Sequence, residues 1–99
     1  MTRGPRLYLV CYDIGDPKRL RNVWKIMRGR GERVQYSVYR CVLSPLQLEQ
    51  LEDVLESIVH AQEDQVLIVP LGHAEKKRSW RMYTLGRPLP EPERTVQVF

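Results

Sequence analysis

The sequence has few of the features that mark a secreted, zinc-binding or membrane-spanning protein. It contains two cysteines in 99 residues, too few for a disulfide framework, and no Cys-x-x-Cys pair or histidine-rich segment that would indicate zinc. No apolar run approaches the roughly 20 residues of a membrane helix. The run at 7–11 is too short for the core of a signal peptide, and Asp13 follows it closely. We therefore expect a cytoplasmic protein with reduced cysteines and no membrane association.

Charge is distributed unevenly along the chain. Lys and Arg number 16 against 12 Asp and Glu, for a net charge of +4. Residues 1–50 carry ten basic and four acidic side chains, whereas residues 51–99 carry six and eight. This asymmetry is typical of a protein that binds a polyanion, most simply nucleic acid, although a soluble basic protein without such a partner can have the same composition.

The first half of the chain begins with a strand pattern and a helix pattern. The apolar and aromatic run at 7–12 predicts a strand. Asp16, followed by proline, predicts a helix start with Asp16 as the N-cap. Apolar residues then recur at i, i+3, i+4 and i+7 from Leu20, which gives the helix one buried face. Gly29 and Gly31, which tolerate positive φ, are expected to end it.

The chain continues with strand, helix and strand patterns. Residues 32–43 are strand-like, and their length fits two tightly joined strands or one bent strand. The pattern Ser44-Pro-x-Gln47 predicts a capping box at the start of a second helix, whose apolar stripe runs to Val59. Residues 66–70 predict another strand. This order predicts an α+β fold, a ferredoxin-like βαββαβ sandwich with an antiparallel sheet and both helices on one face.

We expect a single domain over residues 1–85. Residues 86–99 add a proline-rich connector and an extra C-terminal strand at 95–99, which would pair with its own sheet or with the edge of a partner. Two helices on one face leave the other face of the sheet uncovered. Association through that face would cover it, and the commonest such assembly is a two-fold homodimer.

Asp13 is the first candidate for chemistry. It follows the first predicted strand, and Asp16 already serves as N-cap of the helix, so the Asp13 carboxylate has no evident structural role. A carboxylate at a strand end suits Mg²⁺, which binds one or two carboxylates and retains several waters. In a two-fold dimer, a second copy of Asp13 would double the ligands. The alternative is a turn-forming Asp that bonds its own backbone.

The first predicted helix also carries a basic stripe on the side away from its apolar face. Its members fall at i, i+3, i+7 and i+10: Lys18, Arg21, Lys25 and Arg28. Arg19 and Arg33 extend the positive field. Like charges on one stripe repel each other, and an anionic partner such as a phosphate backbone would relieve that repulsion. A solvated helix face is the alternative.

Three polar residues follow on or between the next strands. The hydroxyls of Ser37 and Tyr39 are candidates to contact phosphate or sugar oxygens, and Arg40 is a candidate to clamp a phosphate. The alternative is that they are ordinary sheet and turn residues. The RNA-recognition signature Lys/Arg-Gly-Phe/Tyr-Gly-Phe is absent, so no stacking platform of that type is expected.

In this order, the features resemble the Cas2 family of small CRISPR-associated endonucleases. The likeness covers about residues 6–88, and the segments that carry it are Leu9-Val10-Cys11-Tyr12-Asp13-Ile14, the basic helix, Gln35-Tyr36-Ser37-Val38-Tyr39 and Gln65-Val66-Leu67-Ile68. It implies a ferredoxin-like homodimer and an Mg²⁺-dependent phosphodiesterase with Asp13 as the metal ligand at the dimer axis. It also implies partnership with the CRISPR integrase in capturing foreign DNA as new spacers.

Three functions follow as hypotheses. The first is a metal-dependent endonuclease that cleaves RNA or DNA during spacer acquisition in antiviral defence. The second is a non-enzymatic DNA-binding scaffold that bridges the integrase subunits. The third is a ferredoxin-like small-molecule sensor dimer, against which the basic stripe argues. The first two share fold, dimer and nucleic-acid surface, and they differ only in the role of Asp13.

Overall fold

The computed structural model describes residues 4–74 and 83–88. Within them, six elements follow the predicted order: β1 (Arg6–Asp13), α1 (Pro17–Arg28), β2 (Glu32–Gln35), β3 (Val38–Leu43), α2 (Pro45–Glu56) and β4 (Gln65–His73). The strand-like segment 32–43 therefore forms two strands, joined by a two-residue turn. The predicted strand at 95–99 lies outside the described residues. Neither described helix has the length or the apolar composition needed to span a membrane.

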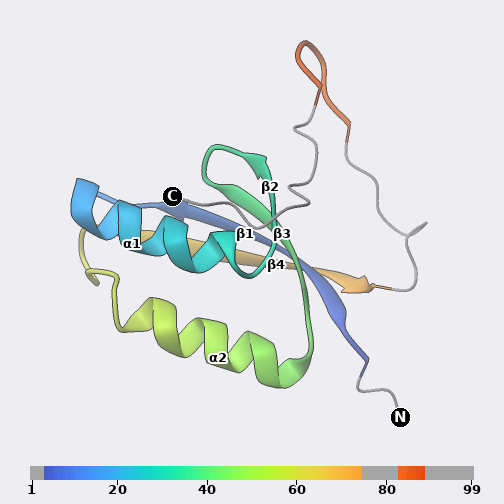
Figure 1. The fold of residues 1–99 in the computed structure, drawn as a ribbon, viewed down its shortest axis with the longest axis horizontal. Coiled ribbons are helices and arrows are strands. Elements are labelled where there is room, and N and C mark those ends of the chain that lie inside the picture. Colours follow the sequence, from blue (N-terminus) through green and yellow to red (C-terminus); the bar gives the residue numbers. More distant parts are fainter. Residues whose placement is uncertain (1–3, 75–82, 89–99) are drawn as a thin grey trace.

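The four strands form one antiparallel sheet in the order β2-β3-β1-β4. β1 is central, and its Val10 pairs with Tyr39 on β3 and with Ile68 on β4. Figure 1 shows α1 and α2 running beside one another along the sheet. This is the ferredoxin-like βαββαβ arrangement that the pattern of the sequence predicts.

The core lies between the sheet and the two helices. Side chains alternate along a strand, so Tyr8, Val10 and Tyr12 of β1 point to the helices and are buried. Val23 of α1 and Leu51 of α2 meet them there and are fully buried. Burying a valine or leucine side chain contributes about 1.5–3 kcal/mol. The apolar stripes of the two helices therefore hold them on the same face of the sheet.

The opposite face of the sheet is apolar and is covered by no described helix. The strand register places Leu9 beside Val69, and Cys11 beside Leu67. Exposure on this face reaches 51% for Val42 and 54% for Leu67. We call this surface the open sheet face; its exposed or half-buried apolar members are Leu9, Cys11, Val38, Val42, Leu67 and Val69.

Both helices start as predicted, but α2 is shorter than its apolar stripe indicates. The Ser44–Gln47 capping box is present, and Asp16 caps α1. The prediction that α2 runs to Val59 is wrong, because the helix ends at Glu56. The Ser57 hydroxyl donates a hydrogen bond of 2.6 Å to a backbone carbonyl of the last turn, a local bond that competes with helix continuation.

The first helix ends at the glycines, as predicted, but neither of them has the positive φ that the prediction invoked. Gly29 is the C-cap of α1 with φ of −87°, and the described glycines with positive φ are Gly72 and Gly86. Gly31 serves a different purpose. A Cβ atom there would lie 2.5 Å from the carbonyl oxygen of Arg40, so the close approach of the chain to β3 requires glycine.

Candidate functional site

Asp13 is the last residue of β1, and it is exposed. It lies opposite Gln65, the first residue of β4, and strand alternation places it on the same side as the open sheet face. Within residues 4–74 and 83–88, no hydrogen bond or ion pair engages its carboxylate. The alternative of a turn-forming Asp that bonds its own backbone therefore finds no support.

Two other aspartates lie near this end of the sheet, and both carboxylates are engaged. Asp16 accepts a hydrogen bond of 2.9 Å from the backbone N–H of Arg19 as the N-cap of α1. The Asp64 side chain is completely inaccessible and accepts four hydrogen bonds. Asp13 is thus the exposed and unengaged carboxylate of the three.

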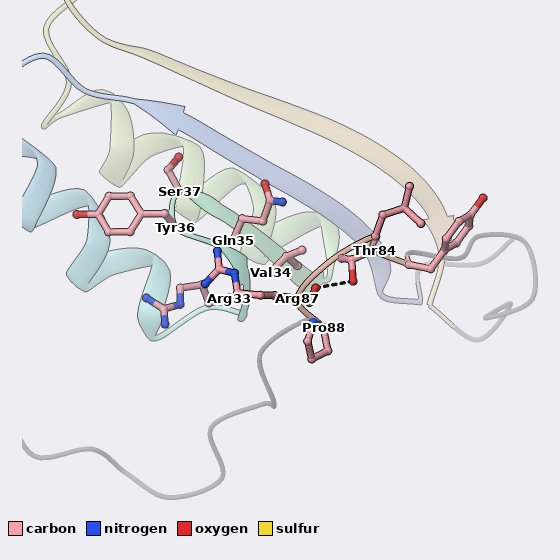
Figure 2. A pocket seen from close by; sticks show the side chains of 10 residues that line it. Arg33, Val34, Gln35, Tyr36, Ser37, Thr84, Arg87 and Pro88 are labelled. Carbon is pink, nitrogen blue, oxygen red and sulfur yellow. Dashed lines mark hydrogen bonds between the residues drawn. The ribbon is translucent and has the colours of Figure 1, made fainter.

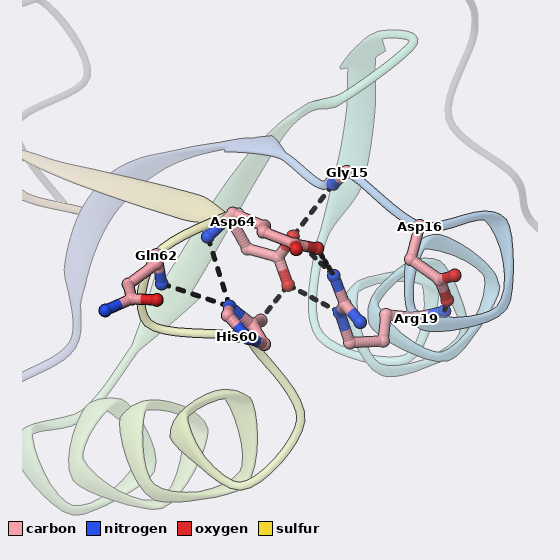
Figure 3. A network of polar contacts seen from close by, with 7 residues as sticks. Gly15, Asp16, Arg19, His60, Gln62 and Asp64 are labelled. Carbon is pink, nitrogen blue, oxygen red and sulfur yellow. Dashed lines mark hydrogen bonds and ion pairs between the residues drawn. The ribbon is translucent and has the colours of Figure 1, made fainter.

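The bonds to Asp64 join loops that are distant in sequence (Figure 3). Its Oδ1 accepts from the backbone N–H of Gly15 at 2.8 Å and from Arg19 Nη2 at 3.2 Å. Its Oδ2 accepts from Arg19 Nε at 2.7 Å and from the backbone N–H of His60 at 2.7 Å. The hydrogen bonds from Arg19 and from the two backbone groups hold the pKa of the Asp64 carboxyl well below its usual range.

The sequence did not single out Asp64 or its neighbour Glu63, which accepts from Arg19 Nη2 at 3.0 Å. The hydrogen bonds from Arg19 to Asp64 and to Glu63 raise the pKa of the guanidinium above its usual range. An aspartate that immediately precedes the strand opposite Asp13 was the available signal. That position places Asp64 at the same end of the sheet as Asp13, but no local pattern in the sequence pairs Asp64 with Arg19.

The residues around Asp13 are consistent with Mg²⁺ in chemistry but are few in number. A carboxylate oxygen is a ligand that Mg²⁺ prefers, and this ion takes as few as one or two protein carboxylates. The described residues contain no group of three or more His, Cys, Asp or Glu side chains placed to hold a metal. Asp13 alone in one chain therefore fits a hydrated, weakly held cation rather than a closed metal cage.

The predicted basic stripe on α1 divides into exposed and engaged members. Lys18, Arg21 and Lys25 are exposed. The Arg28 guanidinium instead lies over the Trp24 ring, 4.7 Å from its centroid, at the cation–π distance that favours a fixed position. Arg19 turns toward Asp64 and Glu63 rather than outward, so the structure places it apart from the exposed stripe.

The three residues between and on β2 and β3 that were predicted to contact nucleic acid lie in different environments. Ser37 lies in the turn between the strands, where its carbonyl accepts from the Tyr12 N–H at 3.0 Å. Tyr39 is only 3% exposed, so its side chain belongs to the core. Arg40 forms an ion pair of 2.6 Å with Glu32.

Arg33 and Ser37 line an open cleft beside β2, shown in Figure 2. The cleft has a volume of about 1000 Å³, and residues 83–88 form part of its wall. Arg87 adds a second guanidinium-bearing residue to the lining. The cleft therefore joins two of the sequence-predicted contacts with a basic residue that the sequence did not single out.

Fold and site together define a ferredoxin-like protein with an exposed acid at the end of its first strand and a basic first helix. Residues 6–79 match the family described as CRISPR associated protein Cas2. The chain belongs to this family, as the resemblance of its motifs indicates.

Known relatives agree with this assignment. The chain is 42% identical to a CRISPR-associated endoribonuclease Cas2 of Thermodesulfovibrio yellowstonii over 64 residues, 65% of this chain and 70% of that one. It is 46% identical to one of Rhodospirillum rubrum over 74 residues, 75% of this chain and 72% of that one. A crystal structure of a hypothetical protein from Thermus thermophilus aligns with a TM-score of 0.75 and 33% identity, covering 91% of this chain and all (100%) of that one.

Proposed function

We propose that the protein is an Mg²⁺-dependent endonuclease that hydrolyses phosphodiester bonds in RNA or DNA. The observation that carries this proposal is the exposed Asp13 carboxylate at the end of β1, which no described side chain engages. The names of the relatives, which are endoribonucleases, favour RNA as the first substrate to test. We further propose that the activity serves spacer acquisition, together with the CRISPR integrase.

Asp13 would hold the cation in this proposal. A bound Mg²⁺ supplies a coordinated water of lowered pKa and offsets the charge of the phosphodiester. The protein's own residues bring the substrate to that point. Lys18, Arg21 and Lys25 are exposed on α1, and Lys18 lies in its first turn, five residues after Asp13. Their charge attracts the phosphate backbone without regard to sequence.

We further propose that two copies of the chain form a homodimer through the open sheet face. This face is apolar, and a soluble chain gains by covering such a surface. Asp13 is on the same side of the sheet. A two-fold interface uses the same patch on both subunits, so a dimer axis near the β1 end would bring two Asp13 carboxylates together. Two carboxylates match the number that Mg²⁺ commonly takes from protein.

The proposal is tested by comparing wild type and Asp13→Asn on RNA and on double-stranded DNA, with Mg²⁺ and with EDTA. The amide keeps the shape of the side chain but removes its charge. We expect Mg²⁺-dependent cleavage that is abolished in the variant, because the amide removes the charged metal ligand, with nucleic-acid binding retained. Asp53→Asn, which changes an exposed aspartate on α2, is the matched control and should cleave as wild type does.

The remaining outcomes separate the alternatives. Equal cleavage by wild type and Asp13→Asn removes Asp13 from the reaction. If no form cleaves either substrate while DNA binding persists, the protein is a scaffold that bridges integrase subunits. If it binds neither RNA nor DNA, the small-molecule sensor becomes the better description.

A further inference from the structure

The loop that follows Asp13 is anchored to a second loop far away in sequence. Residues 14–16 connect β1 to α1, and residues 57–64 connect α2 to β4. Asp64 joins the two, and the next residue, Gln65, is the strand partner of Asp13. The anchor therefore lies one residue along the chain from the partner of the proposed metal ligand.

The Asp64 carboxylate has no capacity left for a metal or a substrate. Each of its oxygens accepts two hydrogen bonds, and its side chain is inaccessible to solvent. Three of the four donors belong to the polypeptide that follows Asp13: the Gly15 N–H and two nitrogens of Arg19. Hydrogen bonds to a charged group are short and directional. Asp64 is thus equipped to fix a backbone and not to react.

Two further contacts hold the same loop in place. The side chain of Asp16 accepts a hydrogen bond from the backbone N–H of Arg19. This bond fixes the backbone at the start of α1, at the residue whose side chain contacts Asp64. A Cβ atom at Gly15 would lie 3.1 Å from the carbonyl oxygen of Glu63. The two loops therefore pack directly against each other, and the backbone after Asp13 has little freedom.

We infer that Asp64 is a positioning residue for Asp13. Through the Gly15 N–H and the Arg19 guanidinium, it fixes the backbone after β1 and so the direction of the Asp13 carboxylate. As far as it concerns metal binding and cleavage, this inference rests on the proposed function. It also gives Arg19 a different role from that of Lys18 and Arg21, because its guanidinium serves the loop and not the nucleic acid.

The experiment compares wild type with Asp64→Asn and Arg19→Lys, and uses Asp53→Asn as the exposed control. Asparagine keeps one oxygen but presents an NH₂ group to two of the four donors: either the Gly15 N–H and Arg19 Nη2, or Arg19 Nε and the His60 N–H. Lysine keeps a positive charge near Asp64 but loses the two-pronged guanidinium. Because Arg19→Lys leaves the Gly15 and His60 bonds to Asp64 intact, it serves if Asp64→Asn does not fold.

Two readouts need no catalysis. The first is the hydrogen-exchange rate of the Gly15 amide, which we expect to rise by about tenfold or more in Asp64→Asn. The second is the Mn²⁺ concentration at which paramagnetic broadening reduces the intensity of the Ile14 amide resonance to half. Mn²⁺ serves here as a paramagnetic substitute for Mg²⁺. We expect this concentration to rise about tenfold, the size of effect typical for residues that orient a metal ligand. Arg19→Lys should shift both readouts in the same direction by less.

Cleavage adds a third readout in the same variants. The Mg²⁺ concentration for half-maximal cleavage should rise with the Mn²⁺ value, while binding of nucleic acid stays as in wild type. Folded Asp64→Asn with wild-type exchange at Gly15, or with wild-type affinity for Mn²⁺, overturns the inference. So does an Arg19→Lys variant with both values unchanged. If wild type does not cleave at all, the proposed function fails, and the exchange and Mn²⁺ measurements still decide the positioning role.

Discussion

The rings of Tyr12 and Tyr39 stack in the core with their centroids 6.3 Å apart and their planes 23° apart. Tyr12 is only 5% exposed and is the residue immediately before Asp13. Burial raises the pKa of Tyr12 to about 12, and Tyr39 and Tyr36 contribute in the same direction. The proposed metal ligand therefore follows directly from a buried, neutral aromatic pair.

The raised pKa of Tyr12 predicts a loss of stability at alkaline pH. Unfolded tyrosine loses its proton near pH 10, whereas folded Tyr12 keeps it until about pH 12. Its stabilising effect is therefore complete below pH 10 and lost between pH 10 and 12. Denaturant unfolding should show wild type losing about 2 kcal/mol more than Tyr12→Phe over that range. Tyr83→Phe, at an exposed position, should lose as much as wild type.

Gly31 predicts an intolerance to any side chain. A Cβ atom there would lie 2.5 Å from the Arg40 carbonyl oxygen and 2.6 Å from Cys41 Sγ, whereas at Gly29 the nearest atom would be 3.7 Å away. Overpacking of this kind costs about 1–3 kcal/mol. Chemical denaturation should therefore show Gly31→Ala destabilised by about that amount and Gly29→Ala within about 0.5 kcal/mol of wild type. Equal stability of the two variants would contradict the close approach at Gly31.

Local patterns predicted most of the fold. The order of elements, the Asp16 cap and the Ser44 capping box all depend on residues a few positions apart. The Arg28–Trp24 contact also has a local i, i+4 spacing, and alternation along β3 indicates a core position for Tyr39. The Asp64 anchor could not be predicted this way, because it joins Gly15 to a residue 49 positions along the chain and depends on how two loops meet.

The open sheet face is the surface through which the proposed dimer would form. Leu67 is 54% exposed on that face, and Leu46 is 61% exposed at the start of α2, away from it. Leu67→Lys should produce monomers at concentrations where wild type is dimeric, because it places a charge in an apolar interface. Leu46→Lys is the matched control. Sedimentation velocity over a concentration series distinguishes the two, and a dimer that survives Leu67→Lys must use another surface.

The exposed part of the basic stripe predicts how binding of nucleic acid responds to salt. Arg21 and Lys25 are exposed, whereas Arg28 packs on Trp24 and Arg19 on Asp64. Each phosphate contact contributes about 0.9 to the slope of log affinity against log salt for duplex DNA. Changing Arg21 and Lys25 to Ala should therefore reduce that slope by up to about two units, with a similar loss of affinity for unrelated sequences.

A charge-preserving control separates this electrostatic effect from a structural one. The double variant Arg21→Lys and Lys25→Arg keeps both charges on α1 and should keep the wild-type slope. Fluorescence anisotropy with a labelled duplex at several salt concentrations measures all three proteins. An unchanged slope in the alanine variant would show that nucleic acid binds to another surface. The next residues to substitute would then be Arg33 and Arg87 of the cleft, because they lie outside α1.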